Sequence, residues 1–285
     1  MATGYVLYNR KAGDMRKSVD VMKLCEMVDE ELKFVDVTTI SDYKVFLSKM
    51  NEDDFIILSG GDGTINKFVN NIDGLDYTGE VLYFPNGTGN DFANEMGYKR
   101  GCKPFSIKKY IKDLPIVTVN NKKYRFINGI GYGIDGYCCE VGDEIKKNSD
   151  KPVNYTTIAI KGLLFHYKPT NAKVTVDGKT STYNKVWMAP TMKGKYFGGG
   201  MMPTPQQDRM NKDKTLSLMV LHSCSKLKIL RYFPSVFEGK HIKHTDIIKI
   251  MKGNEITVEF DRPTALQIDG ETILGVTSYT AKSST

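Results

Sequence analysis

The strongest constraint on the fold is a glycine-rich turn between an apolar run and a helical pattern. The turn is Gly60-Gly61-Asp62-Gly63-Thr64; it follows the strand-like residues 55–58 and precedes a segment that begins at Ile65. Glycines let the main chain approach a ligand closely, and the first N–H groups of a helix point at anions. The pattern therefore predicts a phosphate site at the end of a strand.

Asp62 is the unusual member of this turn. A carboxylate beside phosphate oxygens is repelled unless a cation lies between them, and Mg²⁺ is commonly held by carboxylates together with phosphates. Taken alone, the turn also fits an ordinary surface Asp-Gly turn. The rest of the chain has to decide between the two interpretations.

Composition excludes several classes of protein. A chain of 285 residues with 40% hydrophobic and 26% charged residues is typical of a globular protein with one large or two medium domains. No apolar run is long enough for a membrane span, so we expect a cytoplasmic protein. The five cysteines lack CxxC spacing and predict neither a disulfide framework nor a zinc site.

The net charge of +7 favours an anionic partner, such as nucleotide phosphates or an acidic membrane surface. Nucleic acid would also fit the charge, but no aromatic RNA-binding motif, zinc-finger spacing or long basic run accompanies it. We therefore expect no nucleic-acid partner.

Strands and helices alternate over the first 115 or so residues. Strand patterns occur at residues 5–8, 33–37, 55–58 and 80–84, and this alternation predicts a parallel sheet. Glycine-bearing loops follow three of these strands, and the carboxyl ends of parallel strands are where such sheets bind ligands. Three loops at one edge favour the phosphate site over the surface turn.

The second half has a different pattern. Hairpins are predicted around Asn120-Asn121, Asp177-Gly178 and Lys252-Gly253-Asn254, and helices at 135–147, 155–166 and 227–237. We predict an α/β domain with a largely parallel sheet over residues 1–122. A β-sandwich-like, mostly antiparallel domain follows over residues 123–285, and its final strand, 273–282, is a candidate to return to the first domain.

Two loops carry a family resemblance. Gly60–Thr64 and Pro85–Ala93 resemble the GGDGT and PxGTGNDFA motifs of the diacylglycerol kinase catalytic domain. Further matches to the family are Asn9-Arg10-Lys11-Ala12-Gly13, Asn128–Asp135, Gly198–Met202 and Gln267–Glu271. The resemblance covers nearly the whole chain and is greatest to soluble bacterial diacylglycerol kinase-like lipid kinases. These are relatives of sphingosine and ceramide kinases and more distant ones of NAD kinase.

The resemblance implies a transfer of the γ-phosphoryl group of ATP, with Mg²⁺, to the hydroxyl of diacylglycerol or a related lipid in a cleft between the domains. Asp269 would be the general base, with Glu271 beside it and Asp62 as a further catalytic residue. The implied metal-linked carboxylates are Asp62, Asp91 and Asp135. The implied nucleotide-binding residues are Asn9, Gly13, Gly60, Gly61, Gly63, Thr64, Gly87, Thr88, Gly89 and Asn90.

A lipid substrate implies peripheral association of a cytoplasmic protein with a membrane surface. We expect lysines near the mouth of the cleft to contact anionic headgroups; the candidates are Lys146, Lys147, Lys161, Lys193 and Lys195. Whether the chain forms a homodimer, and which lipid it phosphorylates, stay open at this stage.

Two alternatives remain. NAD kinases share the GGDGT turn but lack the GTGNDFA loop, which is complete here. A non-catalytic nucleotide- or membrane-binding module would not need four retained carboxylates. Their presence argues against such a module; they are Asp62, Asp91, Asp135 and Asp269. In some family members a loop near residue 214 holds a structural magnesium; Lys214 and Ser217 break that pattern, so no second metal is assigned.

Overall fold

The computed structural model describes residues 2–10, 21–148 and 153–284, and the chain divides into two compact units. Unit 1 comprises residues 1–114 and unit 2 residues 115–285. The boundary precedes the predicted one at 122/123, because β6 (Ile116–Val119) pairs with β15 (Glu271–Lys282) in the sheet of unit 2.

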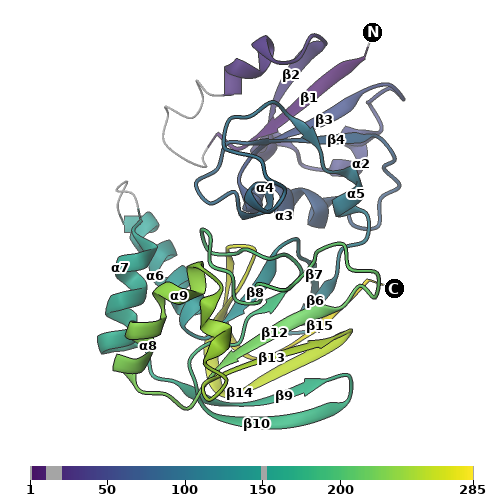
Figure 1. Cartoon of the computed structure of the whole chain (residues 1–285). Helices are drawn as coiled ribbons and strands as arrows, with labels where there is room; N and C mark the ends of the chain where they lie inside the picture. Colours follow the sequence, from purple (N-terminus) through teal and green to yellow (C-terminus); the bar gives the residue numbers. More distant parts are fainter. Residues whose placement is uncertain (1, 11–20, 149–152, 285) are drawn as a thin grey trace. The chain divides into compact units, whose positions relative to one another are not determined.

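Unit 1 is built on the predicted parallel sheet (Figure 1). Its strand order is β2-β1-β3-β4-β5, and only the short edge strand β5 is antiparallel. The strands are β1 (Thr3–Tyr8), β2 (Glu31–Asp36), β3 (Phe55–Gly60), β4 (Glu80–Pro85) and β5 (Phe105–Ser106). Gly60 is the register partner of Pro85, so the loops that follow β3 and β4 begin side by side.

Short helices follow these strands. They are η1 (Lys23–Glu26), η2 (Val37–Thr39), α2 (Tyr43–Leu47), α3 (Asp62–Asn71), α4 (Asp91–Glu95) and α5 (Lys108–Ile111). In α3, Ile65, Phe68 and Val69 are buried, the i, i+3, i+4 spacing of a helix with one apolar face. The core on the β1, β3 and β4 side contains Val6, Ile57 and Phe84.

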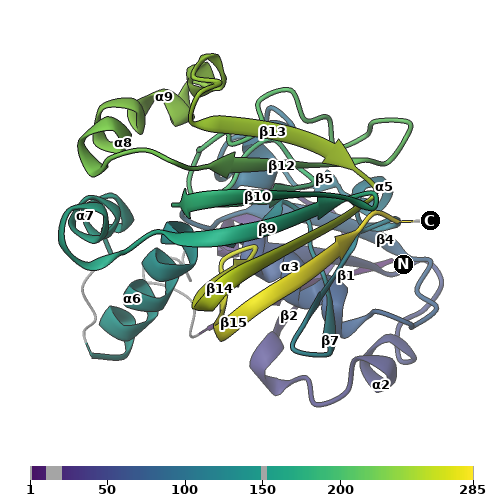
Figure 2. The same cartoon turned by 90° about the horizontal axis from the view of Figure 1, so that it is seen from below.

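Among its described residues, unit 2 holds an antiparallel sheet of ten strands (Figure 2). The path runs β13-β12-β11-β8-β14-β15-β6-β7, with β9 paired to β14 and β10. Besides β6 and β15, the strands are β7 (Lys122–Arg125), β8 (Gly129–Tyr132), β9 (Thr170–Val176), β10 (Lys179–Val186), β11 (Thr191–Met192), β12 (Leu216–Leu221), β13 (Ile248–Gly253) and β14 (Glu255–Ile268). The predicted hairpins β6–β7 and β9–β10 are confirmed.

The third predicted hairpin, around Gly253, is wrong. β13 pairs with β12, whereas β14 pairs with β8, β9 and β15. At the crossing, Asp177 Oδ1 accepts the N–H groups of Asn254 and Glu255 at 2.9 and 2.8 Å and so directs the chain toward β9. β15 pairs with β14 and β6, so the final strand stays in unit 2.

The helices of unit 2 lie together at one end of its sheet (Figures 1 and 2). They are α6 (Ile134–Asn148), α7 (Tyr155–Lys161), η3 (Gly162–His166), α8 (Lys226–Tyr232), α9 (Pro234–Phe237) and η4 (Lys240–Lys243). The predicted helices 135–147 and 155–166 are confirmed, whereas the predicted helix 227–237 is divided at Phe233 into α8 and α9, where Pro234 begins the second helix. In the part of the chain that the structure describes, no helix has the length and apolar character to cross a membrane.

Candidate functional site

The two glycine-rich loops of unit 1 are joined into one platform. The Gly60 carbonyl oxygen accepts the N–H groups of Asn86 and Gly87 at 2.8 and 2.9 Å. A Cβ atom on Gly87 would lie 2.3 Å from Gly61 Cα, so main chain packs directly on main chain and a side chain would separate the loops. The glycines at 61 and 87 are thus required by this contact between the two loops.

Asn90 shapes the second loop from inside. Its backbone is left-handed, with φ of +47°, and its side chain is buried. Asn90 Oδ1 accepts the Gly87 N–H at 3.0 Å and the Tyr83 hydroxyl at 3.2 Å, while Asn90 Nδ2 donates to the Gly87 carbonyl at 2.8 Å. Burial, and then the charge of Asp62, raise the pKa of Tyr83 well above its ordinary value, so this hydroxyl remains a donor. A direct contact of Asn90 with nucleotide stays a prediction.

Asp62 connects the two loops through its carboxylate. Asp62 Oδ2 accepts the Asp91 N–H at 2.8 Å, and Oδ1 accepts the Phe92 N–H at 3.0 Å. These are the first two residues of α4, whose N–H groups have no partner inside the helix. The first residue of α3 therefore caps α4, a contact between residues 29 and 30 positions apart that the sequence did not reveal.

Two carboxylates meet beside Gly89. A Cβ atom on Gly89 would lie 3.7 Å from Asp62 Oδ2 and 3.9 Å from Asp91 Oδ2. Mg²⁺ prefers oxygen ligands and is often held by one or two carboxylates together with phosphate oxygens, so this pair fits a nucleotide-bound magnesium. Among the residues described, no group of three or more His, Cys, Asp or Glu could hold a metal. The remaining ligands would therefore come from nucleotide and water.

The other residues predicted to bind nucleotide lie around this platform. Thr88 and Gly89 are exposed on the second loop, and Gly60 to Thr64 are half-buried between the end of β3 and the first turn of α3. The Thr64 side chain packs directly over Gly60. A Cβ atom on Gly60 would lie 2.0 Å from Thr64 Oγ1, so no larger residue fits at position 60. Asn9 is half-buried just after β1. Gly13 lies outside the described residues.

Asp269, in unit 2, is held by three main-chain donors. Its Oδ2 accepts the Ile127 N–H at 2.6 Å, and its Oδ1 accepts the Asn128 and Gly129 N–H groups at 2.8 and 2.9 Å. The residue has a left-handed φ of +47° in the turn between β14 and β15. Glu271, two residues further, is exposed at the start of β15.

Arg209 contacts the same stretch of main chain, a position that no sequence motif indicated. Its guanidinium donates to the Ile127 carbonyl and, at 2.8 Å, to Asn128 Oδ1. Arg209 is 1% exposed and is among the largest fully buried side chains of the described residues. Residues 127–129 therefore donate to a carboxylate and accept from a guanidinium. A single arginine in the polar stretch 206–214 looks like a surface residue in the sequence.

Asp135 lies at the start of α6 in a cradle of small residues. A Cβ atom on Gly131 would lie 1.5 Å from Asp135 Oδ2, and one on Gly198 would lie 3.9 Å from Oδ1. Gln267 Nε2 donates to Asp135 Oδ2 at 2.8 Å, and Gln267 Oε1 accepts the Gly270 N–H at 2.6 Å. Gln267 thus connects Asp135 to the Asp269 turn within unit 2.

Burial raises the pKa of Asp135 to about 6. Because the folded state then binds the proton more tightly than the unfolded state, stability falls as the pH rises from about 4 to about 6 and is constant above. We expect Asp135→Asn, measured without nucleotide or metal, to raise the free energy of unfolding above pH 6 by on the order of 2–3 kcal/mol. The asparagine oxygen can still accept from Gln267.

Thermal unfolding across this pH range checks the expectation. The wild-type and variant curves should converge toward pH 4, where the buried carboxyl is protonated, and separate as the pH rises. Parallel curves would contradict the raised pKa.

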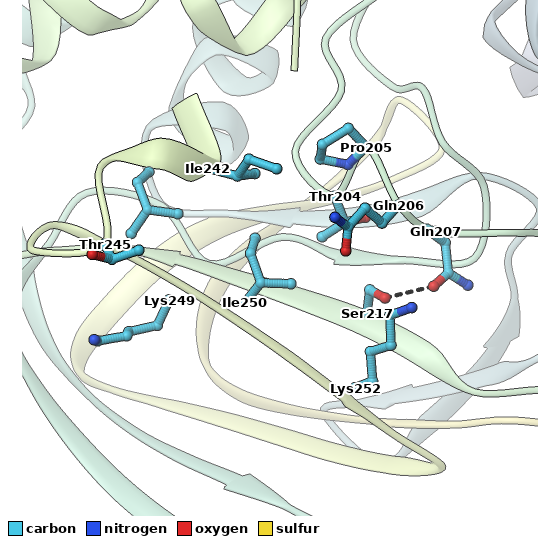
Figure 3. Close-up of a pocket in the computed structure, with 11 residues that line it drawn as sticks. Thr204, Pro205, Gln206, Gln207, Ser217, Ile242, Thr245, Lys249, Ile250 and Lys252 are labelled. Carbon is cyan, nitrogen blue, oxygen red and sulfur yellow. Dashed lines mark hydrogen bonds between the residues drawn. The ribbon is translucent and has the colours of Figure 1, made fainter. Parts of the chain in front are cut away.

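A separate cavity in unit 2 contains none of the predicted site residues. It has a volume of about 350 Å³ and lies between residues 204–207, η4 and the edge strand β13 (Figure 3). Gln207 Oε1 accepts the Ser217 hydroxyl at 2.5 Å on one wall. The chemistry that the sequence predicts therefore centres on loops and turns and not on this cavity.

A glycine platform at the ends of parallel strands, with paired carboxylates beside it, is suited to holding a nucleotide for phosphoryl transfer. Comparisons with known proteins agree with a kinase-type enzyme. Residues 3–116 match the family described as "Diacylglycerol kinase catalytic domain", and residues 128–282 match "YegS C-terminal NAD kinase beta sandwich-like domain". The fold and the matches define a kinase-type enzyme.

Relatives of known name extend over most of the chain. A diacylglycerol kinase of Bacillus subtilis is 28% identical over 78% of this chain and 72% of its own length. A diacylglycerol kinase of Mycobacterium tuberculosis is 24% identical over 72% of this chain and 67% of its own length. A crystal structure of a diacylglycerol kinase from Bacillus anthracis shares the fold, with a TM-score of 0.61 and 18% identity over 99% of this chain and 94% of that one. The chain belongs to the bacterial diacylglycerol kinase-like lipid kinase family.

Proposed function

We propose that this lipid kinase transfers the γ-phosphoryl group of ATP to the hydroxyl of diacylglycerol or a related lipid. The observation that carries the proposal is the joined pair of loops in unit 1. Its backbone N–H groups and the start of α3 offer an anion site, and Asp62 and Asp91 converge beside it.

The roles of unit 1 follow from this geometry. Gly60, Gly61, Gly63 and Thr64 would surround the nucleotide phosphates together with Thr88 and Gly89, while Asp62 and Asp91 would hold Mg²⁺. A bound magnesium neutralises charge on the phosphate oxygens and on the transferred group. The carboxylates can serve this purpose because Asp62 is fixed by its two bonds to α4.

The roles of unit 2 concern the acceptor. The turn Asp269–Glu271 is the proposed proton acceptor for the lipid hydroxyl, with Asp269 as the general base and Glu271 beside it. Three N–H bonds orient Asp269, and Gln267 couples its turn to Asp135. Phosphoryl transfer depends mainly on such positioning and on charge stabilisation. The proposal requires the phosphate held by unit 1 and the hydroxyl held by unit 2 to meet.

The test is product analysis with labelled ATP. The protein is incubated with Mg²⁺ and, in separate reactions, diacylglycerol, monoacylglycerol, phosphatidylglycerol, a sphingoid base and NAD. We expect label in a lipid phosphate, and loss of that product when the metal is chelated. Label in NADP would replace the lipid kinase proposal with the NAD kinase alternative, and ATP-independent lipid binding alone would favour a non-catalytic module.

A further inference from the structure

Two neighbouring helical segments of unit 2 expose large apolar side chains; one is α7 with its continuation η3, and the other is α8. Phe165 of η3 is 72% exposed, Leu227 of α8 is 77% exposed, and Ile160 of α7 is 41% exposed. We call these three residues the α7–α8 face. Single exposed apolar residues are common on protein surfaces, but a cluster of large ones marks an interaction site.

The three residues belong to elements that touch. η3 continues directly from α7, and α8 packs beside η3. Lys226 Nζ donates to the Leu164 carbonyl at 2.7 Å, which joins the residue before Leu227 to the residue before Phe165. Both views show α7 and α8 side by side (Figures 1 and 2). The α7–α8 face is therefore one patch.

The segments that carry this patch contain basic and no acidic residues. Residues 153–172 and 214–237 include no aspartate or glutamate, and Lys161, Lys168 and Arg231 are exposed there. Lys228 of α8 forms an ion pair with Asp246, which lies outside these segments, at 2.5 Å. Of the lysines that the sequence suggested for membrane contact, Lys161 lies on this face, whereas Lys193 is buried and cannot make that contact.

We propose that the α7–α8 face docks on an anionic lipid bilayer, with Phe165 and Leu227 inserted at the headgroup boundary and Lys161, Lys168 and Arg231 against lipid phosphates. The proposal rests on the proposed function, because a lipid substrate resides in a bilayer. Exposed apolar side chains surrounded by basic ones are the pattern of interfacial membrane binding. A protein partner would explain the apolar residues but gives no reason for segments that carry basic and no acidic residues.

The test is sedimentation of the full chain with phosphatidylcholine vesicles that do or do not contain phosphatidylglycerol. We expect binding only to the anionic vesicles, and less of it as salt is added. The double variant Phe165→Ser/Leu227→Ser should bind about tenfold more weakly or worse, and Lys161→Glu/Arg231→Glu should do the same.

The matched control is Val45→Ser/Met210→Ser, which removes two other exposed apolar side chains, 49% and 54% exposed, from α2 and from the loop before β12. It should bind vesicles like the wild type. All variants should keep the wild-type melting temperature, because only exposed side chains change.

Turnover on a short-chain, water-soluble diacylglycerol separates docking from chemistry. The docking variants should match the wild type on this substrate and lose activity only on vesicles. Wild-type binding to anionic vesicles without phosphorylation of any lipid would contradict the proposed function and leave docking intact. Undiminished vesicle binding by Phe165→Ser/Leu227→Ser would overturn the docking proposal. So would conversion of a dimer to a monomer by this variant with vesicle binding unchanged, measured by light scattering, since the face would then join two copies of the chain.

Discussion

Asp269→Asn is expected to lower the free energy of unfolding by about 2–4 kcal/mol and turnover by at least about 100-fold. An asparagine oxygen can replace only one carboxylate oxygen, so its amide group would face the N–H of Ile127 or those of Asn128 and Gly129. Ile127 and Asn128 are buried, and a buried donor without an acceptor is costly. Urea unfolding and turnover with saturating lipid measure the two effects, while ATP binding should change little.

The matched control for this variant is Asp177→Asn. Asp177 also has a left-handed φ, of +47°, and its carboxylate accepts two main-chain N–H groups, but it is exposed in the β9–β10 turn. It should lose a smaller part of the stability and keep full turnover. If Asp269→Asn lost stability alone, with turnover near that of the wild type, Asp269 would be a structural residue and the base would be elsewhere.

The phosphate loops were predictable because their signal is local. A buried strand, a run of glycines and a helical pattern lie within about twenty residues in each case, and strand–helix alternation predicts a parallel sheet. The register of β3 and β4 then brings the two loops together, because Gly60 lies opposite Pro85 and both loops begin at this pair. The structure added the reason for Gly61 and Gly87, which is mutual main-chain contact.

The partners of the carboxylates could not be predicted. Asp269 takes its donors from residues about 140 positions earlier in the chain, and Gln267 reaches Asp135 across 132 positions. A single sequence does not report such contacts. The hairpin predicted at Gly253 is wrong for the same reason. The short polar link between β13 and β14 resembles a hairpin turn, but the pairing of β13 with β12 depends on residues elsewhere in the chain.

The burial of Arg209 could not be predicted from the sequence. Polar composition around residues 206–214 predicts an exposed loop, yet the guanidinium is enclosed and bonded to residues 127 and 128. Buried cations require partners that the fold supplies. The residues that present them immediately precede β8 and lie 82 and 81 positions before Arg209 in the chain.

Asp62→Asn is expected to weaken the binding of magnesium-ATP by about tenfold or more and to lower turnover by at least about 100-fold. Asparagine keeps one acceptor for the first N–H groups of α4, but its amide group would face the other N–H, as in Asp269→Asn, so stability should also fall, by about 1–3 kcal/mol. The loss of charge is different, because Asp62 and Asp91 both lie beside Gly89, where a metal would need them. Turnover should therefore require more Mg²⁺ in the variant, measured by metal titration at fixed ATP.

Asp42→Asn separates capping from metal binding. Asp42 caps α2 with the same chemistry, since its Oδ1 accepts the N–H groups of Lys44 and Val45 at 2.7 and 3.3 Å, but it is exposed and remote in sequence from both glycine loops. This substitution should leave the Mg²⁺ requirement and turnover unchanged. If Asp62→Asn also left the Mg²⁺ requirement and turnover unchanged, the role of Asp62 would be limited to capping α4 and joining the two loops, and Asp62 would not bind the metal. A raised Mg²⁺ requirement in Asp62→Asn alone assigns it both roles, because the same two bonds that cap α4 hold the carboxylate where the metal would bind.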